Sequence, residues 1–193
     1  GVSSRFGQPA NAGVAGSAPG DLLGEAEVVL VTDVIVAMQN AVLVRALLIA
    51  GNETTATALS NLVFILATQP AVAAMLQASV DDEKLMNRFV EELLRIEPPV
   101  RALSRMTTCE VELGGKTLPS GAHLLLMYAS ANDDPDLFAN PRTFDMERAN
   151  IMKHVSFGGG VHKCVGLALA RMEIKVAARQ LVRRLTDFRL AIA

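Results

Sequence analysis

The feature that most constrains the fold of this chain is a long apolar stretch from Glu27 to Ala67. Charged and amide side chains interrupt this stretch at Asp33, Gln39, Asn40, Arg45, Asn52 and Glu53. It therefore contains no run of about 18 uncharged apolar residues, which is the length that a membrane span needs. We expect a long helix over residues 34–69, ended by Pro70 and buried inside a soluble protein, and no membrane span.

Two shorter helices are expected to follow the long one. The first covers residues 71–78. The second covers residues 81–96, where an acidic run beginning at Asp81 marks the start and Pro98 and Pro99 mark the stop. Both segments have the start and stop signals of helices in a globular protein.

A short β-hairpin is expected next. The stretch CEVELGGKTLPSGAHLLLMY alternates apolar and polar residues on both sides of Gly114 and Gly115. Residues 132–153 contain Pro135 and Pro141 and should meander without regular structure, and a last helix is expected from Val165 to Leu185. The predicted fold class is mainly α with a small β-sheet.

Composition indicates a single globular domain and excludes some functions. The chain has 193 residues, 51% of them hydrophobic, a formal net charge of −2, one Tyr and no Trp, so it offers no basic or aromatic footprint for nucleic acid. Its two cysteines are not in a CxxC pattern, which favours a reducing compartment over a disulfide framework or a structural zinc site. Residues 1–20 resemble a loose tail and not a signal peptide. We expect one domain over residues 21–193 and a cytoplasmic location.

The segment FGGGVHKCVG, residues 157–166, places a cysteine beside a glycine run where the last helix is expected to begin. Free backbone N–H groups and the helix dipole at such a position favour a thiolate at Cys164. The preceding glycines let the backbone approach whatever the sulfur contacts. Taken alone, these features also fit a small buried cysteine beside a flexible loop.

The spacing FxxGxHxCxG in this segment resembles the haem-binding loop of the cytochrome P450 family. In that family a cysteine thiolate is the axial ligand of the haem iron. The resemblance therefore implies that Cys164 is the axial ligand of the iron of haem b. It also implies that Phe157 packs beside the sulfur, that His162 points at a haem propionate, and that Gly160 and Gly166 clear room for hydrogen bonds to the sulfur.

A second motif, AGNETT at residues 50–55, is similar to the distal-helix motif of the same family. The resemblance implies that Ala50 and Gly51 border the cofactor, and that Glu53 and Thr54 supply an acid and an alcohol for proton delivery. We expect a local bulge, because Gly51 weakens the helix and the Thr54 hydroxyl can bond to a carbonyl one turn earlier. By itself, the motif also fits an ordinary buried helix.

The segment EELLR carries the ExxR pattern of the family, with Glu92 and Arg95 three residues apart on one helix face. Such a pair alone is common on surface helices. The resemblance implies a buried structural triad completed by Arg148 of FDMER, and it assigns Arg105 to a haem propionate, although a lone arginine also fits a surface cation.

The resemblance covers roughly residues 40–193 and corresponds to the C-terminal half of a typical family member. It implies a haem-thiolate monooxygenase that uses dioxygen and two electrons to hydroxylate a small apolar molecule. Because the chain has no GxGxxG or flavin motif, the electrons would come from NAD(P)H through a separate ferredoxin or flavoprotein. The alternative is a truncated, non-catalytic fragment with weak or no haem binding, because a half-covered pocket does not exclude water.

Cations cluster near the cysteine, at Lys163, Arg171, Lys175 and Arg179. One interpretation is a docking face for a small acidic ferredoxin, which such a face would steer electrostatically. The other is the solvated side of an amphipathic helix, which carries Lys and Arg at the same spacing.

Overall fold

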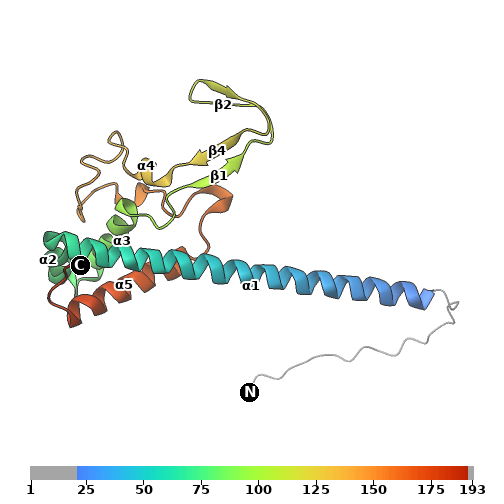
Figure 1. Ribbon diagram of the computed structural model, residues 1–193, viewed down its shortest axis with the longest axis horizontal. Helices are drawn as coiled ribbons and strands as arrows, with labels where there is room; N and C mark the ends of the chain where they lie inside the picture. Colours follow the sequence, from blue (N-terminus) through green and yellow to red (C-terminus); the bar gives the residue numbers. More distant parts are fainter. Residues whose placement is uncertain (1–20, 191–193) are drawn as a thin grey trace, which may run out of the picture. The chain divides into compact units, whose positions relative to one another are not determined.

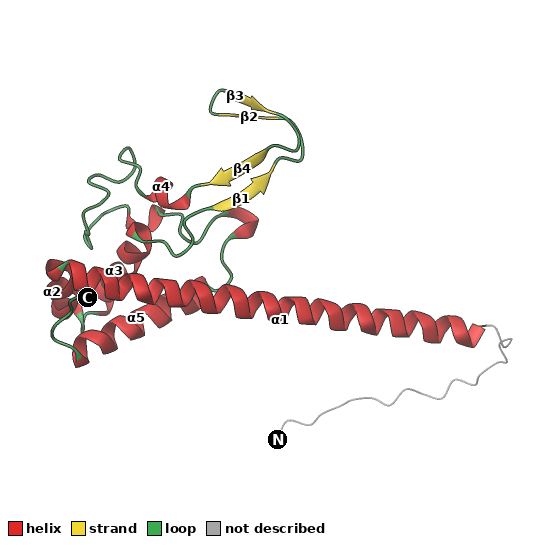
Figure 2. Ribbon diagram, viewed as in Figure 1, coloured by secondary structure: helices red, strands yellow, loops and turns green. Residues whose placement is uncertain are grey.

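The computed structural model describes the backbone of residues 21–190 and the side chains of residues 33–190. The tail expected over residues 1–20 lies outside the described residues. The described chain is mainly helical, with two small antiparallel sheets (Figures 1 and 2). The predicted fold class, mainly α with a small β component, is confirmed.

Helix α1 extends over Asp21–Thr68, so it begins 13 residues before the predicted start at residue 34. It ends as predicted, immediately before the segment that Pro70 opens. The chain divides into two compact units, one ending at Leu48 and the other beginning at Ile49. In the second unit, α1 buries Ala58, Leu62, Ile65 and Leu66.

Residues 34–49 of α1 are all exposed in this structure, whereas the sequence predicted burial along the whole helix. Apolar side chains follow one another directly here, as at Val42, Leu43 and Val44, which are each more than half exposed. The stretch is therefore apolar on all sides, a pattern typical of a helix that is covered all round. The burial of α1 starts only where the second unit packs against it.

Part of α1, Asp33–Thr68, is long and apolar enough to cross a membrane by length and composition, with a mean hydropathy of 1.9 in its most apolar window. The polar residues that argued against a span therefore do not exclude one by this criterion. The core helix of a soluble protein meets the same criterion.

Helices α2, Pro70–Ser79, and α3, Glu83–Ile96, follow directly. Proline is well suited to the first position of α2, because its missing N–H has no helical partner there. Asp82 caps α3, and its carboxylate accepts a hydrogen bond from the Leu85 N–H at 3.0 Å. Both helices were predicted, with boundaries wrong by one or two residues.

The hydrophobic core joins α1, α2, α3 and the last helix, α5, which covers Leu167–Arg184. Leu62 of α1, Leu76 of α2, Phe89 of α3 and Ile174 of α5 are all fully buried within it. Phe144, from the meander, stacks on Phe89 with ring centroids 5.0 Å apart. This core fixes α3 and α5 relative to each other, and those two helices carry the site described below.

The predicted hairpin is confirmed as β2, Val111–Leu113, paired with β3, Lys116–Leu118. The turn residues Gly114 and Gly115 have φ angles of +58° and +73°, which favour glycine and suit a two-residue hairpin turn.

A second two-stranded sheet was not predicted. It pairs β1, Leu103–Met106, with β4, His123–Leu126.

Short helical segments interrupt the remaining loops: α4 at Tyr128–Asn132, and 3₁₀ turns η1 at Ile151–Lys153 and η2 at Gly160–His162. The meander expected over residues 132–153 has no regular element between residues 133 and 150, but η1 at its end was not predicted. Helix α5 begins at Leu167 and not at Val165, because Gly166 occupies the N-cap position.

Candidate functional site

The loop over residues 157–166, which we call the Cys164 loop, is closed by its own backbone. The Cys164 N–H donates to the Phe157 carbonyl at 2.9 Å, and the Lys163 N–H donates to the Gly160 carbonyl at 3.2 Å. Gly158 and Gly160 have φ angles of +65° and +60°, so this closure requires glycine at both positions. The glycine run shapes a defined turn that ends at the cysteine.

Cys164 is exposed and lies two residues before the Gly166 N-cap of α5. It therefore precedes the helix and does not occupy its first turn, a small correction to the predicted boundary. A Cβ added at Gly159 or Gly160 would meet no atom within 4 Å, whereas one at Gly166 would lie 3.9 Å from the Cys164 Sγ. The side of the loop at Gly159 and Gly160 is open, and the thiol is accessible.

Polar contacts from other elements anchor the start of this loop. The Asn132 side chain accepts the Val155 N–H at 2.8 Å and donates to the Ser156 hydroxyl at 2.8 Å. That hydroxyl donates in turn to the Leu94 carbonyl of α3 at 2.8 Å. The loop entrance is thus attached to α3 and α4.

Sequence reasoning missed a charged network centred on Glu91, the residue before the ExxR pattern. The Arg171 guanidinium of α5 donates to both Glu91 carboxylate oxygens, at 2.6 and 2.9 Å. The His154 Nε2 lies 2.9 Å from the same carboxylate, while its Nδ1 accepts the Ser156 N–H at 3.3 Å. Because Nδ1 accepts, the proton belongs on Nε2, which donates to Glu91. The adjacent glutamates of EELLR were the one sequence signal for this network.

The balance of burial and hydrogen bonding sets the ionisation of Glu91. Burial opposes the charged form and on its own would raise the pKa of Glu91. Hydrogen bonds from His154 and Arg171, helped by the positive charge of Arg171, outweigh that effect and hold the pKa below its ordinary value of 4.5. Glu91 is therefore a stable anion between α3 and α5.

The three residues predicted as a triad lie together in the interior. Glu92 and Arg95 are fully buried and joined by two hydrogen bonds, at 2.8 and 2.9 Å. Arg148, which is 6% exposed, donates from Nε to Glu92 at 3.1 Å. Both guanidiniums also lie over the Phe138 ring, at 5.1 and 6.0 Å from its centroid.

The arginines of this cluster also hold the meander through backbone carbonyls. Arg95 donates to the carbonyls of Asn132 and Pro141, and Arg148 to those of Ala139, Asn140 and Thr143. A loop segment without regular structure is thereby fixed to α3.

The motif at residues 50–55 lies on the exposed part of α1. The Thr54 hydroxyl donates to the Ala50 carbonyl at 2.6 Å, one turn earlier, as expected for a threonine in a helix. The predicted bulge is wrong for this structure, because α1 remains an α-helix through Gly51 and the hydroxyl adds to its backbone bonding. Glu53 is exposed, and a Cβ added at Gly51 would meet no atom within 4 Å.

A direct hydrogen bond connects α1 with the helix that follows the Cys164 loop. The Thr55 hydroxyl, beside Thr54, donates to the Glu173 carboxylate of α5 at 3.2 Å. The motif segment and the cysteine-bearing segment are therefore parts of one packed unit.

The two residues predicted as propionate partners have no carboxylate partner among residues 33–190. Arg105 is half-buried on β1, opposite Leu124, and donates to the Ser104 carbonyl at 2.8 Å. His162 is exposed within η2. Both side chains keep their capacity to donate hydrogen bonds to an acid.

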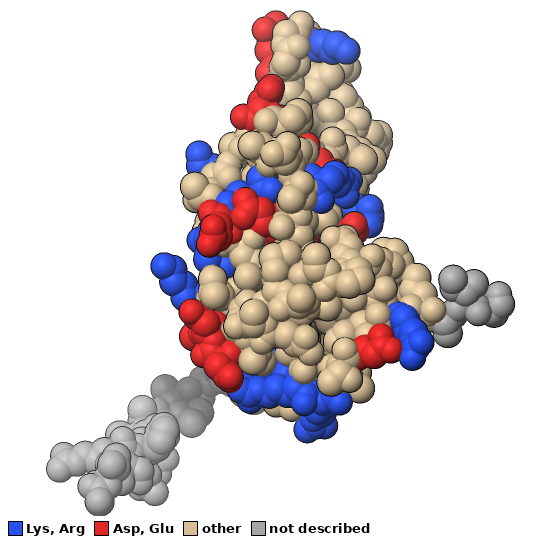
Figure 3. Space-filling view, turned by 90° about the vertical axis from the view of Figure 1, so that its left-hand side faces the viewer, with Lys and Arg blue, Asp and Glu red and all other residues tan. Residues whose placement is uncertain are grey.

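The predicted basic face is largely neutralised. Arg171 pairs with Glu91, and both Lys175 and Arg179 pair with Glu83 of α3. Figure 3 shows Lys and Arg atoms beside Asp and Glu atoms on one face of the molecule. Lys163 is the one of the four cations that forms no ion pair within the described side chains.

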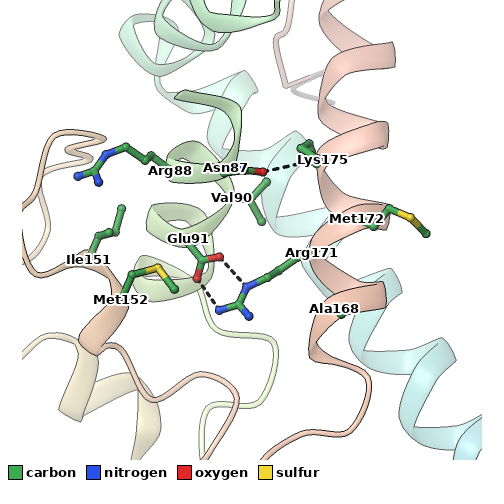
Figure 4. A pocket seen from close by; sticks show the side chains of 10 residues that line it. All are labelled: Asn87, Arg88, Val90, Glu91, Ile151, Met152, Ala168, Arg171, Met172 and Lys175. Carbon is green, nitrogen blue, oxygen red and sulfur yellow. Dashed lines mark hydrogen bonds and ion pairs between the residues drawn. The ribbon is translucent and has the colours of Figure 1, made fainter. Parts of the chain in front are cut away.

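A cavity of about 420 Å³ lies between α3, η1 and α5 (Figure 4). Its wall includes the Glu91–Arg171 pair together with Ile151, Met152 and Met172. The cavity thus adjoins the ion pair that links α3 to α5.

The donor set restricts which metal group this site fits. Within the described residues, no group of three or more His, Cys, Asp or Glu side chains is placed to hold a metal ion. A single exposed thiol on an open glycine turn does not enclose a free ion, but it is able to provide one axial ligand to iron already held by a planar chelator. These residues fit a haem.

Comparison with known proteins agrees with the pattern of the cysteine segment. A family model described as Cytochrome P450 matches residues 38–190. Cytochrome P450 144 of Mycobacterium tuberculosis is 39% identical over 164 residues, which cover 85% of this chain and 37% of that protein. The chain thus spans well under half the length of this curated relative.

Solved structures give the same result. The structure of cytochrome P450 CREJ matches with a TM-score of 0.72 and 34% identity, over 83% of this chain and 42% of that one. P450BioI in complex with an acyl carrier protein ligated to hexadec-9Z-enoic acid matches with a TM-score of 0.66 and 37% identity, over 71% of this chain and 35% of that one. At these identities the likeness extends beyond the fold alone.

Proposed function

This chain belongs to the cytochrome P450 family, and from that premise we propose that it is the haem-thiolate part of a monooxygenase that hydroxylates a small apolar molecule. The observation that carries the proposal is the exposed thiol of Cys164 at the end of a glycine turn, within the segment matched to the family. In this proposal the Cys164 thiolate would bind the iron of haem b.

When bound, haem b supplies the iron at which dioxygen is split, with one oxygen atom going to the substrate and the other, with two protons and two electrons, to water. The turn fixed by Gly158 and Gly160 presents the sulfur without covering it. Phe157 packs against the hydrophobic core beside this turn. In the proposal, Gly160 and Gly166 leave the sulfur accessible, and Phe157 supports the cofactor.

The propionates of the haem are assigned to Arg105 and His162. Both side chains carry hydrogen-bond donors, and neither is paired with a carboxylate within residues 33–190. An arginine would supply a charge-assisted bond to a carboxylate, and a histidine N–H would supply a second hydrogen bond.

We propose that α1 borders the side of the haem where dioxygen would bind, which we call the oxygen side, at Ala50, Gly51, Glu53 and Thr54. The open surface at Gly51 admits a flat group. The Thr54 hydroxyl is held by its hydrogen bond to the Ala50 carbonyl. A hydroxyl beside an exposed carboxylate is able to pass a proton inward from solvent. Glu53 and Thr54 are the proposed proton-delivery pair.

The proposed partners follow from the same reasoning. Two electrons from NAD(P)H would arrive through a ferredoxin or flavoprotein, as membership of the family implies. An apolar substrate is supported by the fatty acyl group named for the related P450BioI complex. The family match includes α1 from residue 38 onward, so we assign that part of the helix to the P450 domain. We also propose a cytoplasmic location, in line with the bacterial relatives.

One observation favours the alternative of a non-catalytic, P450-like fragment. Residues 50–53 of α1 are exposed, so no described element excludes water from that part of the proposed oxygen side. In this alternative the chain binds haem weakly or not at all.

Isotopically labelled dioxygen distinguishes the two. The haem-loaded protein, supplied with NAD(P)H, a ferredoxin reductase and ferredoxin, and a fatty acid as the probe substrate, is expected to yield a product with one labelled oxygen atom. Product without label contradicts the monooxygenase assignment. Failure of the chain to take up haem in a spectral titration supports the fragment.

A further inference from the structure

Two neighbouring glutamates on α3 are buried but serve different clusters. Glu92 points into the triad with Arg95 and Arg148, whereas Glu91 points toward α5 and the Cys164 loop. Burying a carboxylate is costly unless charged donors compensate it. Glu91, whose side chain is 8% exposed, is compensated by Arg171 and by His154.

Arg171 connects Glu91 to an aromatic ring of the loop. Its guanidinium makes two parallel bonds to the Glu91 carboxylate, which fixes the plane of the group (Figure 4). The guanidinium carbon lies 4.7 Å from the centroid of the Phe157 ring, within the range of a cation–π contact. The bidentate ion pair thus determines where the stacked cation sits above Phe157.

Phe157 in turn belongs to the closure of the loop. Its carbonyl accepts the Cys164 N–H at 2.9 Å, so the position of Phe157 sets the position of the cysteine backbone. The His154 ring also lies 6.2 Å from the Phe157 ring, centroid to centroid, and bonds Glu91. Both connections from Glu91 therefore converge on the residue that holds Cys164.

A second ion cluster on the same two helices provides an internal comparison. Glu83 of α3 pairs with Lys175 and Arg179 of α5, but none of these three side chains contacts the Cys164 loop in the described structure. A role limited to clamping α3 against α5 would therefore be shared by Glu83 and Glu91. A role in the loop would belong to Glu91 alone.

We propose that Glu91 is a positioning residue for the Cys164 loop, acting through Arg171 and His154 on Phe157 and through Phe157 on the cysteine. The inference rests on the proposed function in one respect, because the loop matters for chemistry only if Cys164 binds the haem iron. Glu91 itself is not expected to touch cofactor or substrate.

Amide hydrogen exchange of the haem-free chain tests the contact directly. In Glu91→Gln the carboxylate charge is lost at nearly constant shape, and we expect the Cys164 amide to exchange about tenfold faster while amides within α3 keep their protection. Arg171→Lys keeps the charge but removes the planar fork, and we expect the same effect. The matched control, Glu83→Gln, should leave the Cys164 amide within about twofold of the parent.

The carbon monoxide spectrum of the reduced, haem-loaded chain is the second measurement. Glu91→Gln and Arg171→Lys should each convert part of the thiolate-type band to the neutral-thiol type, whereas Glu83→Gln should retain the parent spectrum. Unchanged exchange and an unchanged band in Glu91→Gln would overturn the inference. Equal effects of Glu83→Gln and Glu91→Gln on the Cys164 amide would also overturn it. So would a loss of protection in the α3 amides of Glu91→Gln as large as that of the Cys164 amide. A parent chain without a thiolate-type band would instead overturn the proposed function, and the exchange measurement would still decide whether Glu91 holds the loop.

Discussion

Replacing Glu92 with Gln removes one negative charge from the buried triad while keeping the size and shape of the side chain. In the structure the Glu92 carboxylate accepts four hydrogen bonds: two from Arg95, one from Arg148 and one from the Asp145 N–H. A glutamine amide has only one acceptor oxygen, and its NH₂ group would face an arginine donor. Two guanidiniums, with side chains 0% and 5% exposed, would lose their counter-ion.

The expected loss in the free energy of unfolding is about 3 kcal/mol, since breaking a buried ion pair typically costs about 3 to 5 kcal/mol. We take the lower end because Arg95 and Arg148 keep their carbonyl partners and their positions over Phe138. Such a loss is a large fraction of the roughly 5 to 15 kcal/mol that holds a domain folded.

Urea unfolding followed by circular dichroism measures this loss. With a slope of roughly 2 kcal/mol per molar, the midpoint should fall by about 1.5 M. The matched control is Glu97→Gln, at the end of the same helix, whose partners Arg101 and Arg142 are 63% and 62% exposed, and it should cost no more than about 1 kcal/mol. Equal midpoint shifts for the two variants would refute the claim that burial makes the triad important.

Three further predictions concern the charges and the hydroxyl around the site. The pKa of Glu91 is lowered in the folded state, so its ionised form stabilises the fold fully above pH 4.5, and this stabilisation is lost as the pH falls through the folded pKa. The difference in urea midpoint between the parent and Glu91→Gln should therefore shrink below pH 4.5. A constant difference would contradict this. Thr54→Ala should keep haem binding but yield less product and more hydrogen peroxide per NAD(P)H consumed. An unchanged ratio of product to NAD(P)H would mean that the only role of the Thr54 hydroxyl is its hydrogen bond to the Ala50 carbonyl. Lys163→Glu should slow reduction by an acidic ferredoxin more at low salt than at high salt, because the Debye length falls from about 30 Å at 0.01 M to about 10 Å at 0.1 M; equal rates at every salt concentration would place docking elsewhere.

Local signals in the sequence predicted the end of α1 and the boundaries of α2 and α3 well. Pro70 and Asp82 act through their own backbone and side-chain chemistry, so the boundaries near them were correct within one or two residues. Gly114 and Gly115 likewise predicted the β2–β3 hairpin through a turn of two residues.

Contacts between distant segments were not predictable in the same way. The pairing of Leu103 with Leu126 joins two short strands that are far apart in the sequence and are not connected by a tight turn. No sequence signal in either strand identifies the other as its partner. The Glu91–Arg171 bond spans 80 residues and forms only because α3 and α5 pack on a common core. Arg171 therefore reads as a surface cation in the sequence, although in the structure it is an internal connection to Phe157.

The central claim, that Cys164 is the haem ligand, is tested most directly by the carbon monoxide spectrum of the reduced, haem-loaded protein with each cysteine replaced in turn. Both cysteines are exposed, but only Cys164 lies on the glycine turn, whereas Cys109 lies just before strand β2. We predict that Cys164→Ser abolishes the thiolate-type band and that Cys109→Ser retains it. A band that survives Cys164→Ser, or that disappears in Cys109→Ser, would contradict the assignment.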